Sequence, residues 1–531
     1  MPKPSSTAPR QFLWYDYETW GIHPARDGIA QFAAVITDAD LNIIGEPMDW
    51  KCKPLPDAVI DPSAVMITGL TPGQCEQEGL TEWELASRIN AIMSEPGTCT
   101  VGYNSLRFDD EFTRFLFYRN LLDPYSREWR NQNSRWDLLD VVRLTYALRP
   151  EGIEWPRHDN GDPSFKLEQL TAANGIEHAK AHDAVSDVLA TIALARLIRD
   201  RQPKLFDYAL SLRFKHEVRR QLPLESRQPM LHVSGKIPAR QGCLTDEVPL
   251  MEHPDRRNEI IVLDLMQDPS WLLDHNADEV RDWLYTPTDS LPEGIARPPL
   301  RTLHLNRCPM IAPYRMLDEA TCERFAIDPA RIAQHLAILD RWHDLVSLAR
   351  EVFKTTDRPA PADPQQALYQ GFIGDHDRGI LNQIRRNEHH PETWPGLADG
   401  LQDERQQALV FLARARHFLD SLSAGEQAHW HDLVRIHLTD PDWGSTLTLS
   451  DALAATEQLM AEHPDREDLP KVLSWLEQQD KRWLREPTAT PVPGATEDAN
   501  REAPAQTPAE DTDKKKEPDP PSDDGPQLGL F

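Results

Sequence analysis

The first 200 residues alternate between short apolar runs and longer segments with helical periodicity. Residues 12–19 and 30–37 are rich in aromatic and β-branched side chains, which is typical of strands. Residues 98–101 form a third strand-like run. Five segments repeat apolar residues at a spacing close to 3.6 and predict helices over 81–93, 109–122, 135–148, 166–174 and 184–199. This order indicates an α/β domain that ends near residue 200.

Beyond Pro203 the pattern changes twice. Short strand-like runs cover 231–233, 259–265 and 300–306, a helix is predicted over 330–353, and residues 356–364 with three prolines indicate a linker. The following segment carries only helical patterns, at 378–386, 401–422, 426–437, 449–463 and 469–484. Residues 487–531 hold nine prolines and almost no large apolar side chains before the last four. Such a segment buries too little surface to offset its ordering entropy, so we expect disorder.

These patterns predict a chain of three folded domains and a tail. The α/β domain is predicted at 11–202, a small β-rich domain at 203–355, an all-α domain at 361–485 and a disordered acidic tail at 486–531.

Composition leaves the function open. The 531 residues carry a net charge of −29, which by itself argues against a nucleic-acid partner, since phosphate binding depends on Lys and Arg. A nuclease, however, needs only a local basic channel, and its metal centre is itself acidic. The six cysteines show no Cys-x-x-Cys spacing, which argues against a disulfide framework and a cysteine zinc site. With no long apolar run and no signal-like segment in residues 1–10, we expect a cytoplasmic protein without a membrane partner.

Acidic residues occur at the ends of several predicted elements. Asp16 and Glu18 are two apart near the end of the first strand, so both side chains point to one face. Asp109 stands where a strand gives way to a helix, and His182 and Asp187 stand at the start of the last helix of the α/β domain. Taken singly, each has an ordinary interpretation as a solvated strand end, a helix cap, a surface acid or a loop histidine.

The order of these five residues is more informative than any one of them. Carboxylates supply the hard oxygen ligands that Mg²⁺ or Mn²⁺ prefers. Two such ions stabilise the attacking and departing oxygens of a phosphodiester displacement, and a nearby histidine takes a proton from the attacking water. Asp-x-Glu, a later Asp and His-x4-Asp in this order resemble the DEDD exonuclease superfamily, in its histidine-bearing branch.

Longer stretches resemble one family of that superfamily, the bacterial exodeoxyribonuclease I enzymes. The resemblance is carried by residues 15–19, 31–34, 102–111, 134–140, 146–153, 173–178, 232–235 and 304–309. It covers about residues 11–485 and departs from the family at Tyr15, where His is expected.

The resemblance implies an exonuclease domain with a ribonuclease H-like mixed sheet, an SH3-like domain and a helical domain, which together form a C-shaped clamp around single-stranded DNA. It implies a 3′→5′ exodeoxyribonuclease that releases 5′-mononucleotides and acts in DNA repair and recombination. Asp16, Glu18, Asp109 and Asp187 would then hold two Mg²⁺ ions, with Mn²⁺ as a substitute, and His182 would be the general base.

The resemblance also places a set of residues against the DNA strand. They are Glu18, Arg114, Tyr125, Trp129, Arg143, Lys166, Lys215, Asn258 and Arg301. Tyr125 and Trp129 stand among arginines, which fits base stacking with phosphate contact, although aromatic residues four apart also fill cores. At Lys166 the family has Arg, and Lys keeps the charge but loses the bidentate fork.

Two other functions share parts of this pattern. An RNA-trimming exonuclease or a polymerase proofreading subunit uses the same five-residue site, but the roughly 300 additional residues favour an enzyme that encircles its strand. A nuclease-like scaffold that only binds nucleic acid is disfavoured because all five catalytic positions are filled.

The partners implied by the resemblance are single-stranded DNA and the acidic tail of single-stranded-DNA-binding protein, and the family suggests a monomer. The last residues of the chain give a further expectation. Gln527, Leu528, Leu530 and Phe531 end a long polar segment and resemble the short peptide by which bacterial repair proteins bind the sliding clamp.

Overall fold

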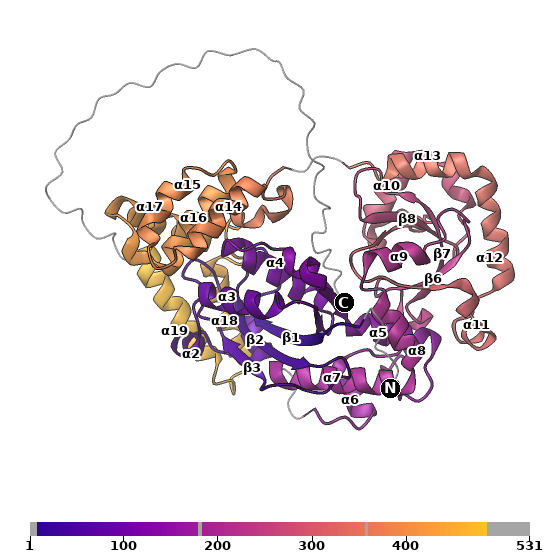
Figure 1. The fold of residues 1–531 in the computed structure, drawn as a ribbon, viewed down its shortest axis with the longest axis horizontal. Helices are drawn as coiled ribbons and strands as arrows, with labels where there is room; N and C mark the ends of the chain where they lie inside the picture. Colours follow the sequence, from indigo (N-terminus) through magenta and orange to yellow (C-terminus); the bar gives the residue numbers. More distant parts are fainter. Residues whose placement is uncertain (1–7, 179–182, 356–358, 486–531) are drawn as a thin grey trace, which may run out of the picture.

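The structure, a computed structural model, describes residues 8–178, 183–355 and 359–485 (Figure 1). The first sheet has the order β3-β2-β1-β4-β5. Its strands are β1 Gln11–Thr19, β2 Ile29–Thr37, β3 Met48–Lys51, β4 Thr98–Gly102 and β5 Ser134–Asp137. The strands β1 to β3 are antiparallel, whereas β4 and β5 run parallel to β1, so the sheet is mixed.

Helices cover both faces of this sheet (Figure 1). They are α1 Pro62–Thr68, α2 Pro72–Glu78, α3 Glu82–Met93, α4 Asp109–Arg119, α5 Leu138–Leu148, α6 Leu167–Ala173, α7 Ala184–Arg201 and α8 Pro203–Ser211. Leu13, Tyr15 and Tyr17 of β1 share a core with α3 and α4, whereas Phe12 and Trp14 share one with α5 and α7. Because side chains alternate along a strand, the even-numbered residues that follow Trp14 lie on the face of α7. The part from β1 to α8 is called the N-terminal unit below.

The second sheet is antiparallel throughout, in the order β10-β6-β7-β8-β9. Its strands are β6 Met230–Val233, β7 Leu244–Glu252, β8 Glu259–Asp264, β9 Leu300–His304 and β10 Met310–Pro313. Its helices are α9 Lys215–Gln221, α10 Ala277–Tyr285, α11 Glu319–Phe325, α12 Pro329–His335 and α13 Trp342–Val352. This part, from α9 to α13, is called the β unit. It joins the N-terminal unit through polar contacts such as Arg135 Nη2 to the Asn306 carbonyl oxygen, at 3.0 Å.

The remaining helices form the helical unit, at the opposite end of the N-terminal unit from the β unit (Figure 1). They are α14 Asp375–Arg386, α15 Trp394–Ala398, α16 Glu404–His417, α17 Ala424–Thr439, α18 Leu449–Glu462 and α19 Leu469–Asp480. Trp83 of α3 packs on Trp394 with ring centroids 5.2 Å apart. The buried Asp57 accepts from Arg416 at 2.5 Å and contacts His437 Nδ1 at 2.8 Å. Apolar and charged contacts therefore both fix the helical unit in place.

Most predicted elements are confirmed, with specific errors. The single helix predicted over 135–148 is wrong: β5 pairs with β4, and α5 starts only after Asp137, whose side chain accepts from Leu139 N at 3.0 Å. The helix predicted over 330–353 is divided into α12 and α13 by a 3₁₀ segment. The elements that the sequence did not predict are the strands β3, β7 and β10 and the helices α1, α2, α8, α9, α10, α11 and α15.

The predicted domain boundaries stay predictions, as does the disordered tail, which lies outside the described residues. None of the helices in the described ranges combines the length and apolar character that crossing a membrane requires.

Candidate active site

Three carboxylates meet at the end of β1. Asp16 and Glu18 lie on the face of β1 that α7 covers, and Asp187 lies in the first turn of α7. One carboxylate oxygen from each residue lies within 4.8 Å of the others. Strand alternation thus brings Asp16 and Glu18 together, and the packing of α7 adds Asp187 from about 170 residues further along the chain.

Asp109 is not among the three residues whose oxygens converge within 4.8 Å, but its charge interacts with that of Asp16. It is the first residue of α4 and is buried, and its Oδ1 accepts a hydrogen bond from the Tyr17 backbone N–H at 3.0 Å. The helix N-cap is Phe108, so Asp109 is not the helix cap that its position in the sequence allowed. Asp16, Glu18, Asp109 and Asp187 are called the carboxylate cluster below.

The carboxylate cluster is electrostatically unfavourable without a cation. Burial and the nearby charge of Asp187 raise the pKa of Asp16 to about 8. Burial, followed by the charges of Asp16 and Asp187, raises the pKa of Glu18 to about 9. Burial and Asp16 also raise the pKa of Asp109. Clustered hard oxygen donors that repel one another are the donor set a divalent cation fits.

The predicted general base, His182, lies outside the described residues. Another histidine contacts the cluster: His178 Nε2 lies 2.5 Å from Asp187 Oδ1, and its Nδ1 lies 3.3 Å from Thr171 Oγ1. The sequence offered His178 only as part of a family-like stretch, with no signal that it reaches Asp187. Asp183 caps α7 by accepting from Ser186 N at 3.1 Å.

The aromatic pair predicted to stack on bases lies in the loop between α4 and β5. Trp129 is 66% exposed, which excludes core packing for this residue, and Tyr125 is half-buried. Lys166 is exposed at the start of α6. The geometry therefore leaves these side chains accessible to a ligand strand.

Arg114 is buried, whereas a side chain that contacts DNA is expected to be exposed. It is 3% exposed, and its guanidinium bonds Glu111 at 2.8 Å and Glu128 at 2.8 and 3.2 Å. It also stacks at 5.4 Å over the Tyr125 ring. In this arrangement Arg114 supports Tyr125 from inside, and its contact with DNA stays a prediction.

Arg114 belongs to a larger set of paired buried charges. Asp110 accepts from Arg127 at 2.6 Å and from Arg135 at 2.9 Å, and Arg135 also pairs with Glu128 at 3.1 Å. The members of this set, called the buried ion network, are Asp110, Glu111, Arg114, Arg127, Glu128 and Arg135.

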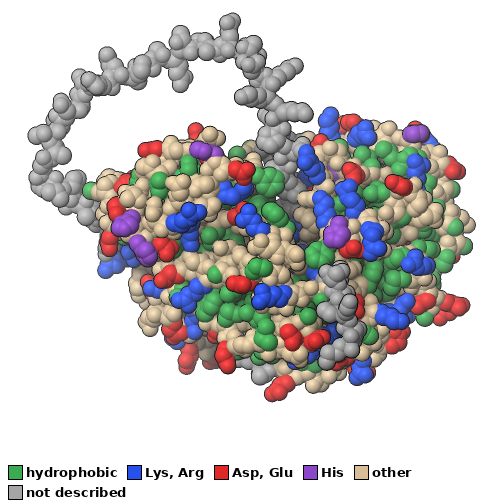
Figure 2. Space-filling view, in the orientation of Figure 1, with side chains coloured by type: hydrophobic (Ala, Val, Ile, Leu, Met, Phe, Trp, Pro, Cys, Tyr) green, Lys and Arg blue, Asp and Glu red, His purple; other side chains and the backbone are tan. Residues whose placement is uncertain are grey.

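Of the remaining predicted DNA contacts, Lys215, Asn258 and Arg301 lie in the β unit and Arg143 lies on α5. Lys215 Nζ donates to Asn258 Oδ1, so the structure brings these two residues together. Arg301 pairs with Asp264 at 2.8 Å and Glu247 at 3.3 Å, and Arg143 pairs with Asp140 at 2.9 Å. Figure 2 shows Lys and Arg side chains gathered on the β unit where it faces the helical unit, although the chain as a whole is acidic.

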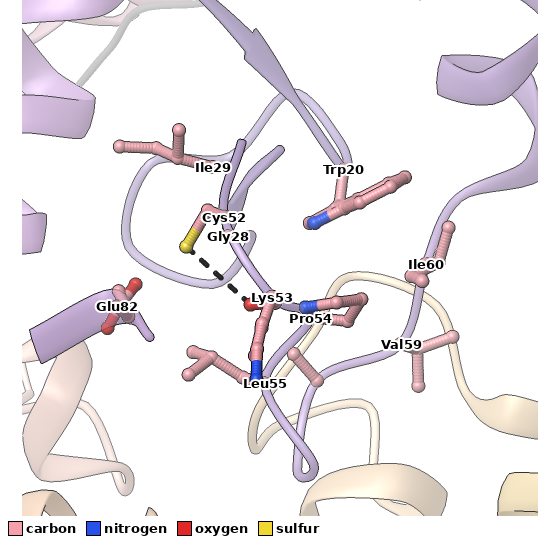
Figure 3. A pocket seen from close by; sticks show the side chains of 11 residues that line it. Trp20, Gly28, Ile29, Cys52, Lys53, Pro54, Leu55, Val59, Ile60 and Glu82 are labelled. Carbon is pink, nitrogen blue, oxygen red and sulfur yellow. Dashed lines mark hydrogen bonds between the residues drawn. The ribbon is translucent and has the colours of Figure 1, made fainter. Parts of the chain in front are cut away.

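A small cavity of about 10 Å³ has no residue of the carboxylate cluster in its lining (Figure 3). Trp20, Cys52 and Glu82 are among its lining residues. Among the described residues, the buried Trp20 Nε1 has no hydrogen-bond partner, and the volume suits at most one water molecule. This cavity has no room for a substrate.

Three family models match consecutive parts of the chain. The model described as Exonuclease matches residues 13–195, that of the Exonuclease I SH3-like domain matches 213–355, and that of the Exonuclease I C-terminal domain matches 362–481. The mixed sheet with its carboxylate cluster, together with these matches, defines an exonuclease. Exodeoxyribonuclease I of Escherichia coli (strain K12) is 44% identical over 420 residues, which are 79% of this chain and 88% of that protein. The chain belongs to the exodeoxyribonuclease I family.

Solved structures agree with this assignment. Exonuclease I from Methylocaldum szegediense matches with 45% identity and a TM-score of 0.84, over 89% of this chain and 99% of that one. E. coli Exonuclease I in complex with a dA16 oligonucleotide matches with 40% identity and a TM-score of 0.84, over 89% of this chain and all of that one. The expected ribonuclease H-like, SH3-like and helical parts are confirmed. Oligoribonucleases that resemble the chain cover 19% to 23% of it, so the RNA-trimming alternative accounts for a minor part of the molecule.

Proposed function

We propose that this protein is a 3′→5′ exodeoxyribonuclease that degrades single-stranded DNA to 5′-mononucleotides. The observation that carries the proposal is the carboxylate cluster, whose ligand oxygens from Asp16, Glu18 and Asp187 lie within 4.8 Å of one another. Burying these carboxylates together costs free energy unless a cation neutralises their charge. Their convergence is therefore typical of a metal-binding site.

Asp16, Glu18 and Asp187 would hold Mg²⁺, with Asp109 as the fourth acid and Mn²⁺ as a substitute. When bound, two such ions stabilise charge on the attacking and departing oxygens of the phosphodiester. Asp109 anchors the β1 backbone through Tyr17 N and so holds Asp16 and Glu18 in register. His182 is the proposed general base, and Glu18 also faces the substrate in this proposal. A related E. coli exonuclease I–DNA complex has been solved with zinc, which supports a divalent metal.

The substrate proposal is supported by the solved relative that holds a dA16 oligonucleotide. The exposed Trp129, the half-buried Tyr125 and the basic residues Arg143, Lys166 and Lys215 offer stacking and phosphate contacts to such a strand. Asn258 and Arg301 would extend these contacts to the β unit.

Protein partners follow from the family in the same way. A complex of SSB with a related Exonuclease I has been solved, and we propose that this chain also binds the acidic tail of SSB. Binding of the sliding clamp through Gln527, Leu528, Leu530 and Phe531, which lie outside the described residues, stays a prediction. The monomeric state, the cytoplasmic location and the role in DNA repair and recombination also stay predictions.

The experiment that tests the function compares matched single-stranded DNA and RNA oligomers, each labelled at either end. With Mg²⁺, we expect loss of the 3′ label first and accumulation of 5′-mononucleotides from DNA. Removal of Mg²⁺ by EDTA should stop the reaction while DNA binding survives. Equal degradation of RNA, or loss of the 5′ label first, would contradict the proposal.

A further inference from the structure

Two aromatic side chains stand out on the surface of the described chain. Trp129 and Phe372 are the most exposed large hydrophobic residues there, at 66% and 62%. Phe372 lies just before α14, far from Trp129 in the sequence, and its ring contacts Tyr125 of the loop that carries Trp129. Trp129 is four residues along from Tyr125, and the Phe372 ring meets the Tyr125 ring edge to face, with centroids 5.7 Å apart. The Phe372–Tyr125 ring pair therefore presents apolar surface on which a ligand could bind.

The loop that carries Phe372 is held firmly from both units. Arg405 of α16 donates to two carbonyl oxygens of this loop, at 2.7 and 3.2 Å. Tyr369, three residues before Phe372, donates its hydroxyl hydrogen to Glu111 of the buried ion network. The ring of Phe372 is therefore presented from a fixed backbone, which lowers the entropy cost of binding a ligand.

A hollow opens beside this ring, between the end of α4 and the start of α14. Its apolar lining includes Leu121, Pro124, Tyr125, Leu368, Phe372 and Leu381. Arg378 also lines it and pairs with Asp123 at 3.4 Å and Asp375 at 2.5 Å. The hollow thus offers an apolar and aromatic surface, and the charge of Arg378 in its lining is already balanced by two carboxylates.

We propose that Phe372 and this hollow bind a nucleobase of single-stranded DNA, so that an aromatic track continues from Trp129 through Tyr125 to the helical unit. The inference rests on the proposed function. A nucleobase is flat and uncharged, so it stacks on an aromatic ring without requiring a basic pocket. An acidic peptide is the less suitable occupant, because Asp123 and Asp375 would repel it.

The test measures the affinity of the full chain for long single-stranded DNA oligomers in EDTA, where no cleavage interferes. Phe372→Ala should weaken binding about 5- to 150-fold, the range that stacking of one base contributes. Phe372→Trp should restore the affinity. The slope of log Kd against log salt should stay at the wild-type value, because no phosphate contact is lost. Leu419→Ala, which removes another exposed apolar side chain of the helical unit, is the matched control and should bind as the wild type does.

Two outcomes would overturn the inference while the proposed function stands. One is wild-type affinity of Phe372→Ala for every oligomer length. The other is normal DNA binding by this variant together with loss of binding to an acidic peptide that ends in Phe, which would assign the hollow to a protein partner. If the wild-type protein itself fails to bind single-stranded DNA, both the proposed function and this inference are lost.

Discussion

Asp109 and Asp110 are neighbours at the start of α4, yet they belong to two clusters of opposite electrostatic character. Asp109 lies in the carboxylate cluster, where burial and the charge of Asp16 raise its pKa. Asp110 lies in the buried ion network. Burial by itself would raise its pKa, but the Arg127 and Arg135 guanidinium groups hold the pKa below its usual range. The network neutralises itself with protein charges, whereas the carboxylate cluster needs a cation from outside.

This difference separates residues that support the fold from residues that serve chemistry. A self-neutralised network stabilises the structure only while every member is present. A cluster of like charges reduces stability and is retained where a bound ion or substrate makes use of it. Adjacent residues of the same type should therefore respond in opposite ways to the same substitution.

The largest effect is expected on activity. Asp16→Asn should reduce nucleotide release from single-stranded DNA to background, because it removes a charge that holds the metal. In EDTA the variant should be at least as stable as the wild type, since one repelling charge is gone. Rates with Mg²⁺ and thermal melting in EDTA check both parts, with the exposed Asp40→Asn as control. Near wild-type activity of Asp16→Asn would remove Asp16 from the metal site.

Asp110→Asn should act mainly on stability and not on activity. The substitution leaves Arg127 and Arg135 buried without their shared carboxylate, and breaking such a pair costs about 3–5 kcal/mol. Urea unfolding monitored by tryptophan fluorescence should show the loss. A variant as stable as Asp40→Asn would show that the network does not stabilise the fold.

The two clusters should also give stability a pH dependence of opposite sign. The pKa values of Asp16 and Glu18 are raised in the folded protein to about 8 and about 9. Their contribution to the free energy of unfolding is therefore fully present below the pKa that these groups have in the unfolded chain, about 4. It is lost as pH rises to about 9. The pKa of Asp110 is lowered, so its contribution is present above about pH 4 and is lost as pH falls.

Melting of the metal-free protein across pH 5 to 9 checks this prediction. We expect the wild type to lose stability toward pH 9, and Asp16→Asn to show a shallower loss. Mg²⁺ should bind more tightly as pH rises through the same range, because the ligands must release protons. A melting temperature that is equally pH-dependent in the wild type and in Asp16→Asn would contradict the assignment.

The smallest effect is expected where the buried ion network reaches the helical unit. Tyr369→Phe removes a hydroxyl that bonds the charged Glu111, and hydrogen bonds to charged groups contribute about 1.5–3 kcal/mol. Tyr118→Phe is the matched comparison. Its hydroxyl crosses the same interface to the uncharged Pro364 carbonyl oxygen, at 3.2 Å, so the loss should be about 0.5–1.5 kcal/mol. Equal losses by urea unfolding would mean that the network charge does not strengthen the contact.

The sequence alone determined the elements and residue types of the active site. Strand alternation at Asp16 and Glu18 and helical periodicity before and after Asp187 are local properties of the chain, and they were readable without coordinates. The three-part organisation followed from changes in periodicity, and the family resemblance supplied the functional class. The boundary between β5 and α5 was misjudged, because β5 has only four residues, Ser-Arg-Trp-Asp, and is too short and too polar to show a strand pattern before the helix.

Only the tertiary structure decided which charges neutralise one another. Nothing local separates Asp109 from Asp110, and nothing local shows that Arg114 is enclosed. The pairing of Phe372 with Tyr125 joins two units nearly 250 residues apart in the chain. Charge pairing and exposure depend on contacts between distant segments, and these contacts arise only when whole units pack together.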